Sequence, residues 1–344
     1  IILFCCTLNI ELLSRETFMG TPEFAVSSLK AILSKEFNVV GVITAPDKPA
    51  GRGRKLNESP VKTYAMEKGL TVFQPKNLKN ECFISDLKKL NANVYVVVAF
   101  RMLPKVIWQI PEFGTFNLHA SLLPNYRGAA PINWVIMNGE SKTGVSTFFI
   151  DDKIDTGDMI LQESLEISRN DTAGELHDKL KDLGSNLVVK TLVLLQQNNV
   201  ETNPQLETAT TKTAHKLTKN NCQIDWSKPV SEIDNHVRGL SPYPSAWCSL
   251  RNDDHILHVK VYQIAILHLK HRLPLGSIIA SNYDIKVACT DGFVFLIREA
   301  GTANPYENIA LIPGTSTPVN TTNGVVPVGT TYSWSAPVVT GGMT

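Results

Sequence analysis

The sequence lacks the features that would place it in a membrane or in an oxidising compartment. No run of apolar residues reaches the roughly 18 needed to span a bilayer, although 43% of the 344 residues are hydrophobic. None of the six cysteines forms a Cys-x-x-Cys pair, which disfavours a zinc ribbon and favours free thiols in a reducing cytosol. The opening residues 1–6 are apolar but short, without the basic leader of a signal peptide. We therefore expect a cytoplasmic protein that does not enter a membrane.

Neither sign of charge is in excess along the chain. It carries 33 Lys and Arg against 32 Asp and Glu, so its formal net charge at pH 7 is +1. A protein with so little net charge has no global field that would draw it onto nucleic acid. Any contact with nucleic acid must therefore come from local basic patches.

Apolar strands alternate with amphipathic helices in the first two thirds of the sequence. Strands are expected at 39–43, 94–100 and 144–150, and helices at 60–68, 81–90 and 172–197. The run VYVVVAF at 94–100 is apolar on both faces, as expected of a parallel strand covered by helices on both sides. This alternation predicts an α/β domain with a doubly wound, mostly parallel sheet.

The following part of the chain has a different pattern. Short strands are expected at 247–250, 256–266, 276–280, 286–289 and 293–297, with one helix at 230–238. Short, evenly spaced strands predict a small OB-like β-barrel. We expect an α/β domain at 18–203, a polar linker at 204–211 and the barrel at 212–300. Residues 1–17 and 301–344 fit neither pattern, since Ser14 to Thr17 are polar and the tail is rich in Thr, Gly, Pro and Val. They are expected to lie outside both domains.

Asn117 and His119 are the first candidates for chemistry. They are two residues apart on an expected strand, so their side chains point to the same face. An amide donor beside an imidazole that can carry a proton makes a pocket for the oxyanion of an acyl transfer. Four carboxylates follow between Asp151 and Asp158. Three have an ordinary interpretation as turn or cap residues, and one near the histidine could orient it and take a proton.

The combination of motifs is more specific than any single residue. Asn-x-His-x-Ser-Leu-Leu-Pro at 117–124 is followed by Tyr-Arg-Gly-x-x-Pro-Ile and later by Asp-Thr-Gly-Asp-Met at 155–159. This series resembles the 10-formyltetrahydrofolate-dependent formyltransferase family, as do the stretches at 18–24, 45–55 and 238–247. The match is greatest to the members that formylate initiator methionyl-tRNA. The resemblance covers residues 18–300 and implies a Rossmann-like formyltransferase domain followed by a tRNA-binding barrel.

The resemblance also implies roles for individual residues. Asn117, His119 and Asp155 correspond to the catalytic residues of the family. The folate-binding positions are Ser121, Leu122, Leu123 and Pro124, together with Phe100, Arg101, Met102 and Leu103 of a loop that lines the pterin pocket. The co-substrate is 10-formyltetrahydrofolate, and no metal is implied.

A basic segment at 47–62 is the candidate contact with RNA. It carries Lys48, Arg52, Arg54 and Lys55 among prolines and glycines, so it reads either as a solvated surface turn or as a flexible arm against phosphates. Its Gly-x-Gly does not open a helix directly after a strand, which excludes a dinucleotide-binding loop. The resemblance favours a tRNA-binding arm.

The expected function is transfer of the formyl group of 10-formyltetrahydrofolate to the α-amino group of initiator methionyl-tRNA, for translation initiation. The expected partners are this tRNA and the folate, and the protein is expected to be a monomer. Two alternatives stay open. One is a formyltransferase for a small amine of the purine pathway or of a sugar, and the other is a catalytically impaired homologue that binds RNA or folate.

Overall fold

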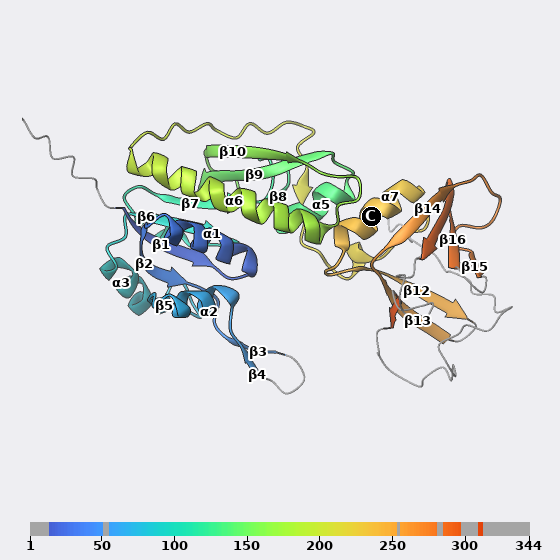
Figure 1. Cartoon of the computed structure of the whole chain (residues 1–344), viewed down its shortest axis with the longest axis horizontal. Helices are drawn as coiled ribbons and strands as arrows, with labels where there is room; N and C mark the ends of the chain where they lie inside the picture. Colours follow the sequence, from blue (N-terminus) through green and yellow to red (C-terminus); the bar gives the residue numbers. More distant parts are fainter. Residues whose placement is uncertain (1–13, 51–54, 253–254, 281–284, 297–308, 312–344) are drawn as a thin grey trace, which may run out of the picture. The chain divides into compact units, whose positions relative to one another are not determined.

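A computed structural model describes residues 14–50, 55–252, 255–280, 285–296 and 309–311 (Figure 1). The described chain forms two compact units. The first takes the residues up to Pro131, Lys142–Glu166 and His177–Thr213, and the second takes Ile132–Ser141, Ile167–Leu176 and the residues from Ala214 onward. No helix in the described ranges is both long enough and apolar enough to cross a bilayer.

A seven-stranded sheet forms the centre of the first unit. Its strands are β1 (Arg15–Gly20), β2 (Asn38–Ile43), β5 (Val72–Phe73), β6 (Val94–Val98), β7 (Thr115–His119), β9 (Lys142–Phe149) and β10 (Met159–Glu166). They lie in the order β10-β9-β7-β6-β1-β2-β5. The pairs from β7 to β5 are parallel, and β9 and β10 are antiparallel to their neighbours. The expected mostly parallel α/β sheet is confirmed.

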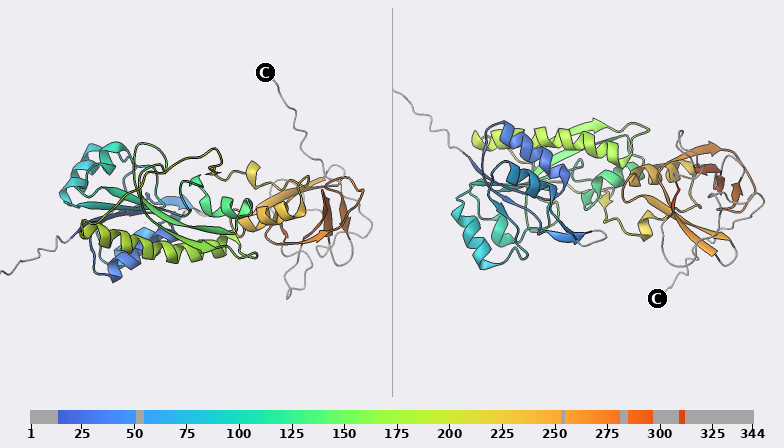
Figure 2. Two further views of the ribbon diagram at one scale, coloured as in Figure 1. Left: turned by 90° about the horizontal axis from the view of Figure 1, so that it is seen from above. Right: turned by 60° about the horizontal axis from the view of Figure 1, so that its bottom comes forward.

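Helices cover both faces of this sheet. They are α1 (Glu23–Ser34), α2 (Pro60–Glu67), α3 (Glu81–Lys89), α4 (Lys105–Trp108) and α6 (Ala173–Gln196), whose first residues belong to the second unit. Figure 2 shows α1 and α6 on one side and α3 on the other. Tyr95 and Val97 of β6 pack in one core cluster with Leu87 of α3 and Ile107 of α4. On the opposite face, a Cβ on Gly184 of α6 would lie 2.8 Å from the side chain of Leu118, so α6 approaches β7 closely.

The first strand begins earlier than the sequence pattern predicts. Residues 15–17 were expected outside the fold because they are polar, and this is wrong, since all three belong to β1. Parallel ladders with β2 and β6 satisfy the backbone on both sides whatever the side chains are. Glu16 and Thr17 are fully buried. Burial raises the pKa of the Glu16 carboxyl to about 7, so this side chain is held largely neutral below that pH.

The second unit is a small barrel-like domain of antiparallel strands with one packed helix. Its elements are α5 (Pro131–Met137), β11 (Thr213–Ala214, where the chain leaves the first unit), η1 (Asn220–Cys222), α7 (Val230–Leu240), β12 (Ala246–Asn252), β13 (His255–Val261), β14 (Ile264–His268), β15 (Ile278–Ala280), β16 (Ile285–Cys289), β17 (Gly292–Leu296) and β18 (Ile309–Leu311). The strands form two sheets, β12-β13-β18 and β14-β17-β16-β15. Val230, Ile233 and Val237 of α7 are buried in the core that these strands share.

Two expectations for this domain are corrected. The single strand expected at 256–266 is two strands, β13 and β14, which break at residues 262–263 and join different sheets. The alternation shifts by one residue at the break, since Val259 and Val261 are buried before it and Ile264 is buried after it. The single predicted strand ran through this shift. Residues 309–311 were expected outside the fold, yet β18 pairs with β13. The β13–β18 ladder is formed by backbone groups, which every residue type carries, so composition does not predict it.

Candidate active site

The candidate site lies where the parallel strands of the first unit end. From β1 the chain moves outward to β2 and β5, and it then returns to the other side of β1 to form β6 and β7. Ligands bind open α/β sheets at such a reversal of strand order, beyond the carboxyl ends of the strands. A cavity of 530 Å³ lies there. It is lined by residues that follow β1, β2 and β6, including Thr21, Asp47, Lys48, Phe100 and Arg101, together with Lys76.

Asn117 and His119 come from β7, and the strand orients both. Leu118 between them packs against α6, so the two side chains point to the opposite face, as alternation requires. His119 is buried with 6% of its surface exposed, while Asn117 is partly exposed. Among the described residues, none is hydrogen-bonded to the Asn117 side chain. Its amide is therefore available to a ligand.

Both ring nitrogens of His119 face other groups of the chain. Nε2 lies 2.8 Å from the carbonyl oxygen of Tyr126. Because a carbonyl only accepts, Nε2 carries the proton of the neutral ring and donates it to this bond. Nδ1 then presents its lone pair toward the carboxylate of Asp155, whose Oδ2 lies 3.7 Å away. A proton taken up at Nδ1 turns this contact into an attractive ion pair.

Asp155 is the carboxylate that reaches the histidine, and the loop around it explains why. Asp151 is used as a turn residue, because its side chain accepts hydrogen bonds from Lys153 N and Thr156 Oγ1. A Cβ on Gly157 would lie 1.7 Å from the Phe149 carbonyl, so only glycine permits this close approach. Asp155 itself has φ 55°, and its Oδ2 accepts from Gly128 N at 2.9 Å. These contacts within the loop and with Gly128 aim one of the four carboxylates at His119.

The segment Ser121 to Pro124, predicted to bind folate, follows His119 in the chain and is held by hydrogen bonds. Ser121 Oγ donates to Asn125 O at 2.7 Å, and Ser146 Oγ donates to Ser121 O at the same distance. Ser121 and Leu123 are buried, whereas Leu122 and Pro124 are partly exposed. A ligand can reach Leu122 and Pro124, and the folate role of the segment stays a prediction.

The predicted pterin loop divides into two parts. Phe100 and Arg101 line the cavity, and the Arg101 guanidinium lies 5.6 Å from the Phe100 ring. Met102 is 69% exposed, and Leu103 is buried in the core beside Ile107. Only the first two residues therefore face the cavity.

The described parts of the basic segment form the two strands of a hairpin. Strands β3 (Lys48–Ala50) and β4 (Lys55–Asn57) pair antiparallel, with Lys48 opposite Asn57, and they project from the sheet in Figure 1. Lys48 is exposed at the rim of the cavity. Arg52 and Arg54 lie outside the described residues, and only the backbone of Lys55 is described. At the base of the hairpin, Lys62 forms an ion pair with Asp47 at 2.5 Å.

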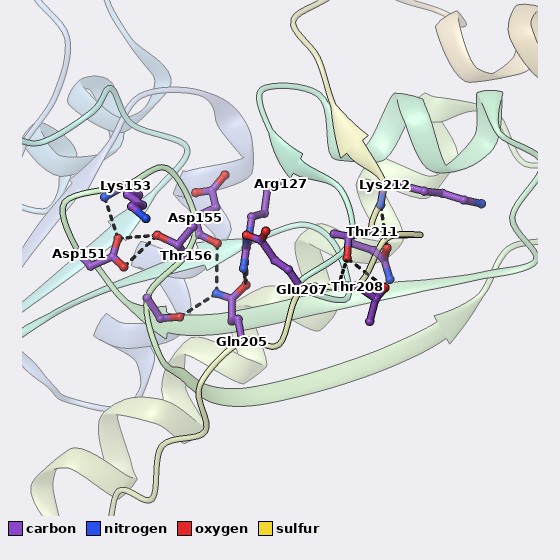
Figure 3. A network of polar contacts seen from close by, with 12 residues as sticks. Arg127, Asp151, Lys153, Asp155, Thr156, Gln205, Glu207, Thr208, Thr211 and Lys212 are labelled. Carbon is purple, nitrogen blue, oxygen red and sulfur yellow. Dashed lines mark hydrogen bonds and ion pairs between the residues drawn. The ribbon is translucent and has the colours of Figure 1, made fainter.

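Three contributors to the site were missed by the sequence analysis. The Tyr126 carbonyl and the Gly128 amide are backbone groups of the loop that ends in β8 (Arg127–Gly128). Residue type carries no signal for such groups. The third is Gln205, which lies in the segment predicted to be a linker and is hydrogen-bonded to the Asp155 loop (Figure 3). The residues around Gln205 are polar and have no helix or strand periodicity, so they were predicted to be a linker.

Known proteins match the chain across both units. Residues 16–192 match the formyl transferase family, and residues 216–304 match the formyl transferase C-terminal domain. A methionyl-tRNA formyltransferase of Flavobacterium johnsoniae is 56% identical over 283 residues, which cover 82% of this chain and 90% of that protein. The methionyl-tRNA formyltransferase of Bacteroides fragilis is 47% identical over 285 residues, covering 81% and 88%.

Solved structures share the fold at lower identity. An N-formyltransferase of Helicobacter canadensis, in complex with folinic acid and dTDP-3-aminofucose, has a TM-score of 0.59 at 22% identity and covers 82% of this chain and 98% of its own. The sugar 3N-formyl transferase WlaRD, in the presence of dTDP and 5-N-formyl-THF, has a TM-score of 0.59 at 20% identity, with coverages of 83% and 97%. These two likenesses concern the fold.

Proposed function

This chain belongs to the formyl transferase family, in its methionyl-tRNA formyltransferase branch, and we propose that Asn117, His119 and Asp155 transfer the formyl group of 10-formyltetrahydrofolate to the α-amino group of initiator methionyl-tRNA. The observation that carries the assignment of residues is the approach of His119 Nδ1 to Asp155 Oδ2 at 3.7 Å. The Asn117 amide lies on the same face of β7 as this pair.

Asn117 stabilises the charge that develops during the reaction. The free α-amine has a pKa of about 8, so a neutral nucleophile is accessible near neutral pH without an activated side chain. As the amine attacks the formyl carbon, negative charge gathers on the formyl oxygen. The uncommitted Asn117 amide donates a hydrogen bond to that oxygen. The new C–N bond forms, and the bond from the formyl carbon to the folate nitrogen breaks.

His119 and Asp155 take the proton that the amine loses. Nε2 is committed to Tyr126, so the proton arrives at Nδ1, the nitrogen that faces Asp155. The resulting imidazolium adds positive charge beside the oxyanion and is balanced by the Asp155 carboxylate. In this arrangement Asn117 holds the oxyanion by a hydrogen bond, and His119 stabilises it by charge. The proton is then available to the folate nitrogen that leaves.

The cavity suits the anionic parts of the two substrates. Its volume of 530 Å³ falls within the usual range of ligand sites, roughly 300–1,000 Å³. Lys48, Lys76 and Arg101 line it, and the one acid, Asp47, is already paired with Lys62. We assign Phe100 and Arg101 to the folate, and Lys48 with the β3–β4 hairpin to the phosphates of the tRNA.

The proposal is tested by formylation of charged initiator tRNA with 10-formyltetrahydrofolate as donor. His119→Ala should lower the rate by at least about 100-fold, and Asp158→Ala, an exposed carboxylate of the Asp155 loop, should leave it unchanged. Small amines offered to the same protein should not be formylated. Formylation of a sugar amine in place of the tRNA would overturn the substrate assignment.

The proposal also covers the oligomeric state of the protein, its need for metal and its formyl donor. We infer that it works as a monomer, that it needs no added metal and that 10-formyltetrahydrofolate is its donor. Activity should survive a chelator, and the sedimentation coefficient should match one 37.9 kDa chain. A dimer under assay conditions, or activity lost on chelation and restored by metal, would contradict it.

A further inference from the structure

The segment after α6 crosses the first unit beside the catalytic loops. Residues 203–212, predicted to include a linker, begin with a bridge in which Asn203 and Met159 exchange backbone hydrogen bonds of 3.0 and 2.8 Å. The segment ends where Lys212 contacts the loop before β8. We call residues 203–212 the strap. Figure 3 shows Gln205 of the strap joined by hydrogen bonds to the Asp155 loop and to Arg127.

Both ends of the Gln205 amide are used. Nε2 donates to the carbonyl of Asp155 at 3.1 Å and to the carbonyl of Gly157 at 2.7 Å. Oε1 accepts from Nε and Nη2 of Arg127 at 3.1 and 2.8 Å. One side chain thereby joins the loop of the catalytic carboxylate to the loop that holds the imidazole. Arg127 also forms an ion pair with Glu207 of the strap.

The two loops that Gln205 joins are the ones that fix the orientation of the His119 ring and the position of the Asp155 carboxylate. The Tyr126 carbonyl accepts from His119, and Gly128 N donates to Asp155, so Arg127 lies between two groups that define the site. The far end of the strap holds the same loop. Lys212 N donates to Asn125 Oδ1 at 3.0 Å, and Tyr126 N donates to Lys212 O at 2.6 Å.

Asp155 needs outside support to keep its position. Its φ of 55° lies in the left-handed region, which is unfavourable for a non-glycine residue and persists only where neighbours hold it. Gln205 binds the backbone carbonyl of this residue. Without that bond the backbone can relax, and the carboxylate then turns away from His119.

We propose that Gln205 is a positioning residue, which sets the geometry of His119 and Asp155 from the strap without touching substrate. The inference rests on the proposed roles of those two residues. A 1 Å displacement of a reacting group can cost on the order of 100-fold in rate. Loss of Gln205 should therefore act on turnover and leave substrate affinity in place.

The first experiment compares Gln205→Ala with Leu206→Ala, whose native side chain is 76% exposed in the same strap. Gln205→Ala should lower kcat about 10- to 100-fold, with KM for both substrates within about threefold and an unchanged melting temperature. Gln205→Glu keeps the acceptor for Arg127 and removes both donors to the loop, so it should lose a similar factor. Leu206→Ala should match the wild type. Unchanged kcat in both Gln205 variants would overturn the inference, as would a loss that follows thermal stability.

A double-mutant cycle separates this inference from the proposed function. If Gln205 acts through Asp155, Gln205→Ala should cost little further activity in an Asp155→Ala background, because effects within one catalytic unit are not additive. Fully additive losses would overturn the positioning role and leave the catalytic role of Asp155 standing. If Asp155→Ala alone is fully active, the proposed function of that residue fails.

Discussion

The Tyr126 carbonyl oxygen lies 2.8 Å from Nε2 of His119. This bond selects the tautomer of the neutral ring and turns Nδ1 toward Asp155. The histidine therefore does not offer a free N–H to a substrate oxygen, and the Asn117 amide is the uncommitted donor on that face of β7. This geometry supports the proposed division of labour, in which the amide binds the oxyanion and the imidazole with its carboxylate accepts the proton.

Replacing Asp155 by Asn should slow the reaction strongly without unfolding the protein. Asn tolerates a positive φ better than most residues, and its amide oxygen can still accept from Gly128 N. The substitution removes only the negative charge and the proton acceptor. We expect kcat to fall at least about 100-fold with no change in thermal stability. The measurement is the single-turnover rate of tRNA formylation, with Asp158→Asn as the matched control.

Removing the Asn117 amide should cost transition-state stabilisation. Loss of one oxyanion donor typically lowers kcat about 100- to 1,000-fold, and Asn117→Ala should fall in this range with KM values within about threefold. Asn117→Asp should be slower still, because it places a negative charge against the developing oxyanion. An Asn117→Ala enzyme that keeps its kcat and loses only folate affinity would show that the amide binds the ground state.

Lys48 should contribute to tRNA use through charge. A phosphate contact adds about 1 to the slope of log affinity against log salt, so Lys48→Ala should reduce that slope by about this amount. It should also raise KM for tRNA and leave KM for folate unchanged. Lys35→Ala, an exposed lysine just after α1, is the control. Arg52→Ala is expected to behave like Lys48→Ala, and equal salt slopes in all three variants would argue against a tRNA arm.

The buried Glu16 should make the stability depend on pH. Burial raises its pKa in the folded state to about 7 from its ordinary value of 4.5, so folding favours the neutral acid. This contribution is fully present below about pH 4.5 and is lost as the pH rises through 7, with a total on the order of 3 kcal/mol. Glu16→Gln should therefore be more stable than the wild type above neutral pH. Urea unfolding from about pH 5 to about pH 8 tests this, with exposed Glu112→Gln as control, and parallel wild-type and Glu16→Gln profiles would contradict it.

The regular elements of the fold were accessible from the sequence where side chains repeat with the period of the element. The helix at 81–90 and the strand at 94–100 were predicted within two residues of α3 and β6. The errors came where backbone pairing outweighs side-chain character. Buried Glu16 and Thr17 look like surface residues, and β18 lies in a segment where no strand was predicted.

That Asn117 and His119 share a face could be predicted from the order of residues alone, because a strand alternates its side chains whatever surrounds it. The family could be predicted as well, through motifs at several separated positions. The resemblance pointed to Asp155, but the structure was needed to show its contact with the histidine and the support that Gln205 gives to the pair. Those contacts join residues that lie far apart along the chain, and they pass through backbone carbonyls and amides that every residue carries alike. The conformation of the loops places these backbone groups, and residue type does not predict that conformation.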